Sequence, residues 1–207
     1  RKAVEAAGYK TTYVEGVPES ADAERVLRQL ANSGHDVIFT TSFGYMNPTN
    51  KVAKEFPNVK FEHATGYKRE HPNVSTYAAR FYEGRAILGT IAGSMTKSNV
   101  IGYVASFPIP EVIRGINAFA TGVQEVNPDA TVEVVWTFTW FGPEEETQAA
   151  NALIETGVDV LAQHQDSPST GVVAEANGAK WISYNTVYGQ EAAPEAFVGA
   201  PVWDWGP

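Results

Sequence analysis

Two large aromatic rings, Trp140 and Phe141, stand directly before a Gly-Pro corner and three acids in the segment TWFGPEEE, residues 139–146. Such rings can fill a core, or they can stack on a flat ligand. Neighbouring residues of an extended strand point to opposite sides, so we expect one ring to lie outside the packed face. The three acids are expected to complement the positive end of the helix that follows.

Polar candidates stand in the segments HQDSPS (164–169) and SYNTVYG (183–189). Asp166 can accept hydrogen bonds from a ligand, or it can cap the next helix. His164 can act as a general base, although without a nucleophile partner a hydrogen-bonded loop role is the alternative. The Asn185 amide can bond to a purine edge or to nearby backbone groups.

Aromatic and polar residues also occur in the segments TTSFGYMNP (40–48), ASFPIPE (105–111) and VWDW (202–205). This mixture suits a flat small molecule that forms hydrogen bonds. The further candidates for ligand contact are Phe43, Tyr45, Asn47, Phe107 and Trp203.

Strand-like and helix-like segments alternate along the chain, which predicts an α/β protein with mostly parallel sheets. In such sheets ligands bind outside the carboxyl ends of the strands, where most of the candidate segments fall. A break in the rhythm near Ser106 predicts two lobes, residues 1–105 and 106–207, although a single doubly wound sheet would show the same alternation. Residues 75–80 are predicted as a polar crossing. The predicted helices are 19–34, 47–56, 81–97, 109–128, 143–156 and 167–177. The predicted strands are 11–16, 35–42, 58–65, 99–106, 130–139, 157–164 and 180–185, with a last extended segment at 196–205.

Composition excludes several classes of function. The net charge is -9 and no run of Lys or Arg occurs, so nucleic acid is not an expected partner. The chain has no Cys, which removes disulfides, thiolate catalysis and Cys-based zinc sites. The motifs of dinucleotide, triphosphate, zinc-peptidase and serine-hydrolase sites do not occur. We therefore predict no cofactor and no metal.

Long motifs then indicate a family. The segments FYEGRAILGTIAGSMTK, IGYVASFPIPEVIRGINAF, TWFGPEEE, HQDSP and VWDWGP resemble the basic membrane protein family, the PnrA-like substrate-binding proteins of bacterial ABC importers. The likeness extends over essentially the whole chain.

This resemblance implies a type I periplasmic-binding-protein fold, with two Rossmann-like lobes enclosing a purine nucleoside or base, such as adenosine or adenine. It implies that Trp140 stacks on the base, with Phe141 the less favoured ring, and that Asp166 approaches the ribose or base edge. Asn185 would be a polar contact where relatives often carry Asp. The first lobe would contribute Phe43, Tyr45 or Asn47.

The resemblance also implies a monomeric, non-enzymatic protein, periplasmic or anchored outside the membrane, that serves a permease and an ATPase. Family members begin with a lipoprotein signal and a first strand, so we expect this chain to be part of a longer protein. Two alternatives stay open: an α/β enzyme acting on nucleosides through Asp166 and His164, and a ligand-sensing regulator with the same fold.

Overall fold

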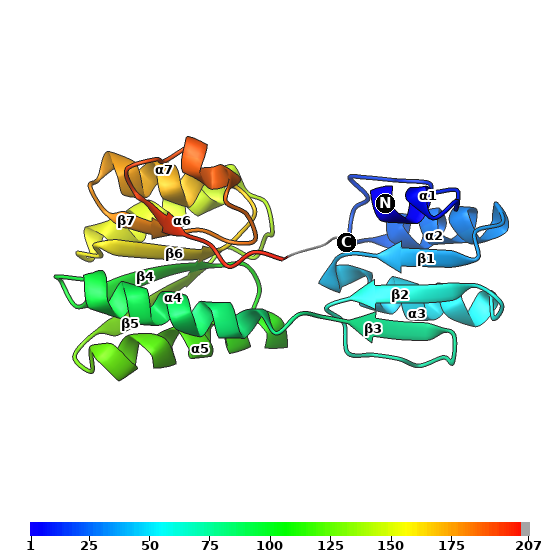
Figure 1. Cartoon of the computed structure of the whole chain (residues 1–207), viewed down its shortest axis with the longest axis horizontal. Coiled ribbons are helices and arrows are strands. Elements are labelled where there is room, and N and C mark those ends of the chain that lie inside the picture. The colour runs from blue at the N-terminus through cyan, green and yellow to red at the C-terminus, as the bar shows by residue number, and fades with distance from the viewer. Residues whose placement is uncertain (204–207) are drawn as a thin grey trace. The chain divides into compact units, whose positions relative to one another are not determined.

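The computed structural model describes residues 1–203, which form two compact units, residues 1–79 and 80–203 (Figure 1). The predicted boundary between residues 105 and 106 is therefore corrected. Helix α4 (Phe81–Met95) packs along α5 (Pro110–Val126), and strand β4 (Val100–Ala105) pairs with two strands of the second unit. These long-range contacts place residues 80–105 in the second unit.

The first unit is a three-stranded parallel sheet in the order β1-β2-β3 with helices packed on it. Its core combines Leu27 and Val52 from the helices with Ile38 and Phe61 from the sheet. Phe39, the residue after Ile38, is 61% exposed, as the alternation of a strand requires. The elements are α1 (Lys2–Ala6), α2 (Ala21–Asn32), β1 (Val37–Thr40), η1 (Phe43–Tyr45), α3 (Met46–Glu55), β2 (Lys60–Ala64) and β3 (Val74–Tyr77).

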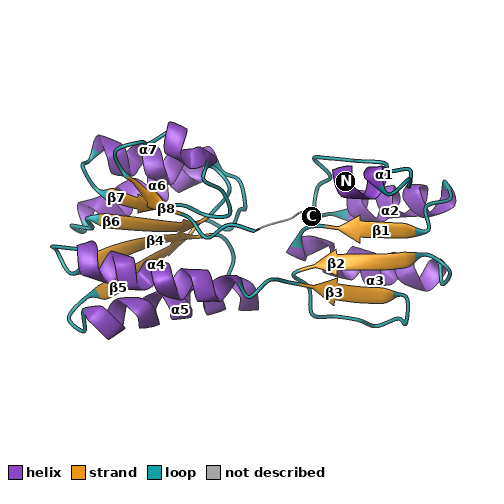
Figure 2. Ribbon diagram, in the orientation of Figure 1, coloured by secondary structure: helices purple, strands orange, loops and turns teal. Residues whose placement is uncertain are grey.

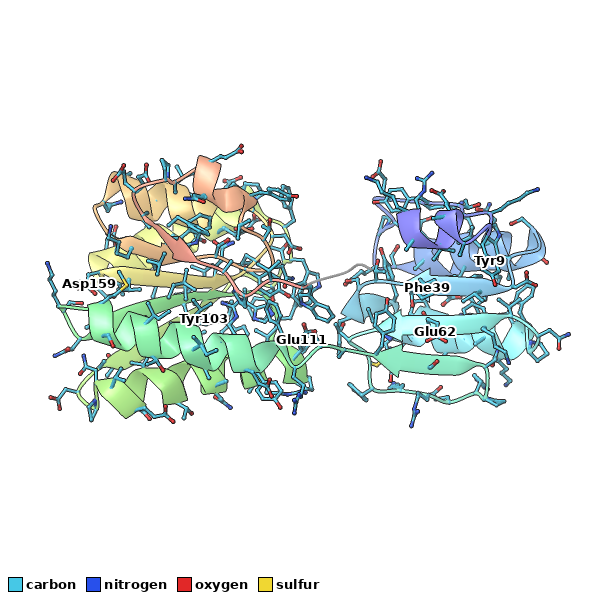
Figure 3. All side chains as sticks on the ribbon, in the orientation of Figure 1. Tyr9, Phe39, Glu62, Tyr103, Glu111 and Asp159 are labelled. Carbon is cyan, nitrogen blue, oxygen red and sulfur yellow. The ribbon has the colours of Figure 1, made fainter. Side chains whose placement is uncertain are left out.

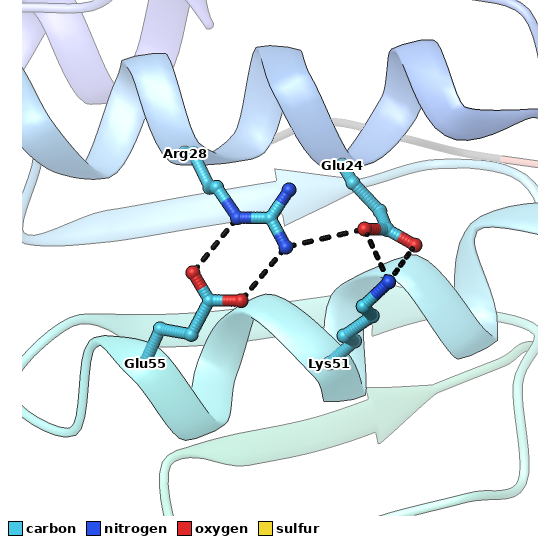
Figure 4. A network of polar contacts seen from close by, with 4 residues as sticks. All are labelled: Glu24, Arg28, Lys51 and Glu55. Atoms are coloured by element: carbon cyan, nitrogen blue, oxygen red, sulfur yellow. Dashed lines mark hydrogen bonds and ion pairs between the residues drawn. The ribbon is translucent and has the colours of Figure 1, made fainter.

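A surface network of charges joins α2 to α3 (Figure 4). The Arg28 guanidinium donates to both carboxylate oxygens of Glu55 at 2.7 Å and to Glu24 at 3.1 Å. Lys51 approaches Glu24 from α3 at 2.8 Å. The two carboxylates raise the pKa of Arg28, chiefly because Glu55 accepts hydrogen bonds from the guanidinium. The network fixes how the two helices lie side by side on the sheet.

The second unit is a five-stranded parallel sheet in the order β5-β4-β6-β7-β8, and helices alternate with its strands along the chain (Figure 2). Its remaining elements are β5 (Thr131–Trp136), α6 (Pro143–Glu155), β6 (Val160–His164), α7 (Ser169–Ala176), β7 (Lys180–Ile182), η2 (Tyr188–Glu191) and β8 (Phe197–Gly199). Both units are parallel α/β layers, so the predicted α/β class is confirmed.

Helices cover both faces of the second sheet. Tyr103 packs with Phe119 of α5 on one face, and the neighbouring Val104 packs with Leu153 of α6 on the other. Helices α4 and α5 approach closely because two glycines face carbonyl groups. A Cβ added to Gly89 would lie 2.0 Å from the Phe119 oxygen, and one added to Gly122 would lie 2.1 Å from the Ala86 oxygen. Side chains at these positions are excluded sterically.

Most predicted elements are confirmed within a few residues, and two local predictions are wrong. Residues 11–16 form a loop rather than a strand, because no neighbouring strand in the described chain supplies hydrogen bonds to them. Residues 75–80 contain most of β3, whose backbone pairs with β2 although Ser75 and Thr76 are polar. Residues 204 and 205 of the last predicted segment lie outside the described residues. Among residues 1–203, no helix combines the length and apolar content that crossing a membrane requires.

Candidate functional site

The carboxyl ends of the second unit's strands gather most of the predicted site residues at one edge of the sheet. Phe107 follows β4, Trp140 follows β5, Asp166 follows β6 and Asn185 follows β7. The strands are parallel, so all four loops leave from the same edge. Figure 3 labels Asp159, at the amino end of β6, and Glu111, in the first turn of α5, near opposite ends of the unit.

Aromatic rings form a continuous series along this edge, here called the ring series. Trp140 lies next to Phe107 at one end of the series and also contacts His164, and the Tyr184 ring lies 4.2 Å from the His164 ring. The other centroid distances are Phe107–Trp140 5.4 Å, Trp140–His164 6.3 Å, Tyr184–Phe81 5.4 Å and Phe81–Trp203 5.8 Å. Two predicted rings, Phe107 and Trp140, are thus in direct contact, and the series continues to Trp203 through His164 and through Tyr184 and Phe81, which were not predicted.

Arg85 lies beneath the ring series and is fully buried. Its guanidinium carbon lies 5.2 Å from the Tyr184 ring centroid and 5.6 Å from the Tyr103 centroid. One nitrogen, Nη2, donates to the Gln163 carbonyl at 2.7 Å, while Nε and Nη1 have no hydrogen-bond partner among the described residues. Aromatic faces and a backbone carbonyl therefore stabilise this cation.

His164 is the last residue of β6 and is buried against Tyr103, whose hydroxyl lies 3.4 Å from Nδ1. Burial, with a smaller contribution from Arg85, lowers the pKa of His164 well below its ordinary value. The ring is therefore neutral at physiological pH. Its ring is a member of the ring series, between Trp140 and Tyr184.

Asp166 lies at the rim of the same edge, with its side chain accessible and its backbone N–H donating to the Trp140 carbonyl at 2.9 Å. Although it is accessible, the surrounding protein desolvates the carboxyl group and raises the pKa of Asp166 to about 6. That combination is typical of a carboxyl group in a hollow. The capping alternative is wrong, because Pro168 occupies the N-cap position of α7 and the Ser169 N–H donates to the Ser167 Oγ at 3.2 Å.

Gln163 holds the backbone on both sides of Asp166. This buried side chain donates from Nε2 to the carbonyls of Gln165 and Ser167, each at 2.8 Å. Its Oε1 accepts from the Trp181 indole N–H at 2.9 Å. The loop therefore has a defined backbone before any ligand arrives.

Glu146 is also buried, although the acids of its segment were predicted only to complement a helix end. Its Oε2 accepts from the Ser167 hydroxyl at 2.7 Å, and its Oε1 accepts from the Gly142 N–H at 3.2 Å. Burial raises the pKa of Glu146, and these donors oppose that effect.

The two remaining candidates of this unit are Phe141 and Asn185. Phe141 is 65% exposed and has no ring partner among residues 1–203, so the two adjacent rings do point to different environments, as predicted. Asn185 adopts a left-handed conformation, with φ 58°, and its buried Oδ1 has no hydrogen-bond partner in the described chain. A strained residue with an unpartnered oxygen beside the rings is a feature of binding sites.

A cavity of about 180 Å³ lies beside this edge of the second unit. Asp166 and Tyr184 line it together with η2 residues that include Tyr188. No group of three or more His, Asp or Glu side chains in the described ranges is arranged to hold a metal ion. The site is therefore built from rings, amides and one carboxyl group.

The first unit places its predicted residues in the loop after β1. The Phe43 ring lies 6.2 Å from Tyr67, which follows β2, so two rings also meet at the carboxyl edge of this sheet. Tyr45 donates from its hydroxyl to the Val17 carbonyl, and Asn47 accepts from Lys68 Nζ at 2.9 Å. Of the three candidates in this unit, Phe43 is the one that contacts another ring, while Tyr45 and Asn47 have hydrogen-bond partners within the protein.

Sequence reasoning missed the residues that organise the ring series: Phe81, Arg85, Gln163, Tyr184 and Glu146. One signal was available in VDVLAQH (158–164), where polar residues interrupt an apolar strand. A buried strand carries such side chains only when they have partners. Phe81 and Arg85 gave no comparable signal, because a helix pattern does not show what its first turn contacts.

Comparison with known proteins places the chain among transport proteins. A family profile described as "ABC transporter substrate-binding protein PnrA-like" matches residues 1–207. A purine-binding protein of Brucella abortus (strain 2308) is 50% identical over 214 residues, covering all of this chain and 59% of that protein. A Haloferax volcanii protein, provisionally named as an ABC transporter glucose-binding protein, is 49% identical over 197 residues, covering 95% of this chain and 49% of that protein. The chain spans about half to three fifths of the length of these relatives.

Solved structures share the fold. An ABC transporter solute-binding protein from Aeropyrum pernix K1 has a TM-score of 0.79 at 23% identity, over 95% of this chain and 58% of that chain. One from Conexibacter woesei DSM 14684 has a TM-score of 0.63 at 26% identity, over 87% of this chain and 61% of that chain. The predicted type I periplasmic-binding-protein fold is confirmed by these likenesses.

Proposed function

This chain belongs to the PnrA-like family of ABC transporter substrate-binding proteins, and from that premise we propose that it binds a purine base or nucleoside. The observation that carries the proposal is the ring series at one sheet edge, whose member Trp140 is joined through its backbone carbonyl to the backbone N–H of Asp166. A purine has a flat face that stacks on an aromatic ring, and its edge carries donors and acceptors.

The polar groups at the rim match the needs of a purine edge. The Asp166 carboxylate can accept from an exocyclic amine or from ribose hydroxyl groups, and the Asn185 amide can both donate and accept. The raised pKa of Asp166, about 6, still leaves the carboxylate ionised at neutral pH. The identity to a purine-binding protein of Brucella abortus supports the same ligand class.

A sugar is the second candidate, because the Haloferax volcanii relative carries a provisional glucose-binding name. A pyranose also presents an apolar face to aromatic rings and hydroxyl groups to carboxylates. The two ligand classes differ in size and in the aromatic character of the stacked face, so direct titration separates them.

The rest of the proposal concerns the whole protein. It would act outside the cytoplasmic membrane, deliver its ligand to a permease driven by an ATPase, and leave that ligand chemically unchanged. The match to a substrate-binding family supports binding over hydrolysis.

The test is calorimetric titration of the full-length protein with adenine, adenosine and glucose, followed by chromatography of the mixture. Saturable binding of adenine or adenosine, with the ligand recovered intact, is the expected result. Binding of glucose alone would replace the purine proposal with the sugar alternative. Release of free base from adenosine would establish the enzyme alternative.

A further inference from the structure

We propose that Glu146 is a positioning residue that joins the loop of Trp140 to the loop of Asp166 and so sets how the stacking ring and the polar group face a ligand. Here the contacts among Gly142, Glu146 and Ser167 are called the Glu146 bridge. The expected effect on ligand affinity rests on the proposed function. The expected effect on the backbone of the two loops does not.

The two donors of the Glu146 bridge lie close in sequence to the residues that are proposed to contact the ligand. Gly142, two residues after Trp140, donates its N–H to Glu146 Oε1 at 3.2 Å. Ser167, directly after Asp166, donates its hydroxyl to Glu146 Oε2 at 2.7 Å. One carboxylate therefore satisfies a donor on each loop, and the Asp166 N–H to Trp140 carbonyl bond closes the connection.

The burial of Glu146 argues against a purely electrostatic role at the helix end. Glu144 and Glu145, in the same first turn of α6, are exposed and can complement the helix dipole. Glu146 is 0% exposed, and burying a carboxylate costs free energy unless hydrogen bonds compensate. Its hydrogen-bond partners are Gly142 on one loop and Ser167 on the other. The buried carboxylate therefore connects the two loops.

Such a bridge raises affinity by ordering the site before the ligand arrives. Without it, the two loops keep only the backbone bond and the Gln165 contact to Thr137 as direct hydrogen-bonded connections among the described residues. Groups that orient ligand contacts commonly change affinity on the order of tenfold or more when removed. We expect a loss of that size for Glu146.

The test compares Glu146→Ala, Glu146→Gln and, as the matched control, Glu144→Ala in the full-length protein. Amide hydrogen exchange of the segments 139–142 and 164–168 is measured without ligand, and adenine is the binding probe. Glu146→Ala is expected to speed exchange of the Asp166 N–H about tenfold and to weaken adenine binding on the order of tenfold. Glu144→Ala is expected to match the wild type.

Glu146→Gln should restore most of both properties, because its amide oxygen can accept from Gly142 while its NH₂ donates to the Ser167 hydroxyl. A merely structural role would speed exchange throughout the second unit instead of in these two loops. Unchanged local exchange in folded Glu146→Ala would overturn the proposal.

If Glu146→Ala does not fold, Ser167→Ala is measured instead, because it removes the hydroxyl that donates to Glu146. Faster exchange confined to the segments 139–142 and 164–168 supports the bridge, and unchanged exchange there overturns it. If the wild-type protein binds no adenine but its exchange follows the expected pattern, the proposed function fails and the Glu146 bridge stands.

Discussion

The backbone N–H of Asp166 donates to the carbonyl oxygen of Trp140 at 2.9 Å, which joins two residues that lie 26 positions apart in the chain. The bond links the loop after β5 to the loop after β6, although β4 lies between these strands in the sheet. The proposed stacking ring and the proposed polar contact are therefore parts of one hydrogen-bonded unit.

Replacing Trp140 by Ala is expected to weaken adenine binding by roughly 1–3 kcal/mol, the loss that follows removal of a stacked aromatic anchor. Phe141→Ala is the matched control, because that neighbouring ring is exposed and outside the ring series. Calorimetric titration measures the affinity of both variants for adenine. Equal affinities for folded Trp140→Ala and the wild type would reject Trp140 as the platform.

Asp166→Asn is expected to weaken binding while the fold is retained, since the Ser167 hydroxyl, rather than the Asp166 carboxylate, bonds to the first turn of α7. Affinity and far-ultraviolet circular dichroism are measured on the same sample. A loss of helix content with unchanged affinity per folded molecule would count against a ligand contact and for a structural role.

The same residue predicts a pH dependence of stability. Folded Asp166 keeps its proton up to about pH 6, whereas an unfolded Asp releases it near pH 4. Between these values the unfolded chain binds fewer protons, so the contribution of Asp166 to the free energy of unfolding falls as pH rises through this window and is level above it. Urea denaturation of Asp166→Asn should lack this fall, whereas the exposed control Asp129→Asn should keep it.

Gln163→Leu is expected to lower the free energy of unfolding. The variant leaves the buried Trp181 indole N–H without its acceptor, and one unsatisfied buried group costs about 1–3 kcal/mol. Gln148→Leu makes the same chemical change at an exposed position of α6 and serves as the control. Chemical denaturation measures both, and equal stabilities would contradict the role assigned to Gln163.

Gly122→Ala is expected to destabilise the second unit by roughly 1–3 kcal/mol, the range for overpacking, because its Cβ would lie 2.1 Å from the Ala86 carbonyl oxygen. Gly115→Ala, on the same helix, would meet nothing closer than 3.5 Å and should be tolerated. Thermal unfolding of the two variants tests whether the close α4–α5 approach depends on the absence of a side chain.

The sequence by itself determined the α/β class, most element positions and the loops in which ligand contacts are expected. These features depend on local periodicity, on caps such as Ser20 and on the helix start at Pro110, all of which neighbouring residues decide. The same local rules predicted that Trp140 and Phe141 would lie in different environments.

Only the tertiary structure decided the unit boundary, the failure of residues 11–16 to form a strand and the membership of the ring series. A strand needs a partner, and a ring contact needs two segments to meet, so neither can be deduced from one segment. Glu146 shows the same limit: its segment indicates an exposed helix start, and only the packing of the next loop against it buries the carboxylate. A local sequence pattern cannot predict such contacts, because only the folded chain brings residues that are distant in sequence close together in space.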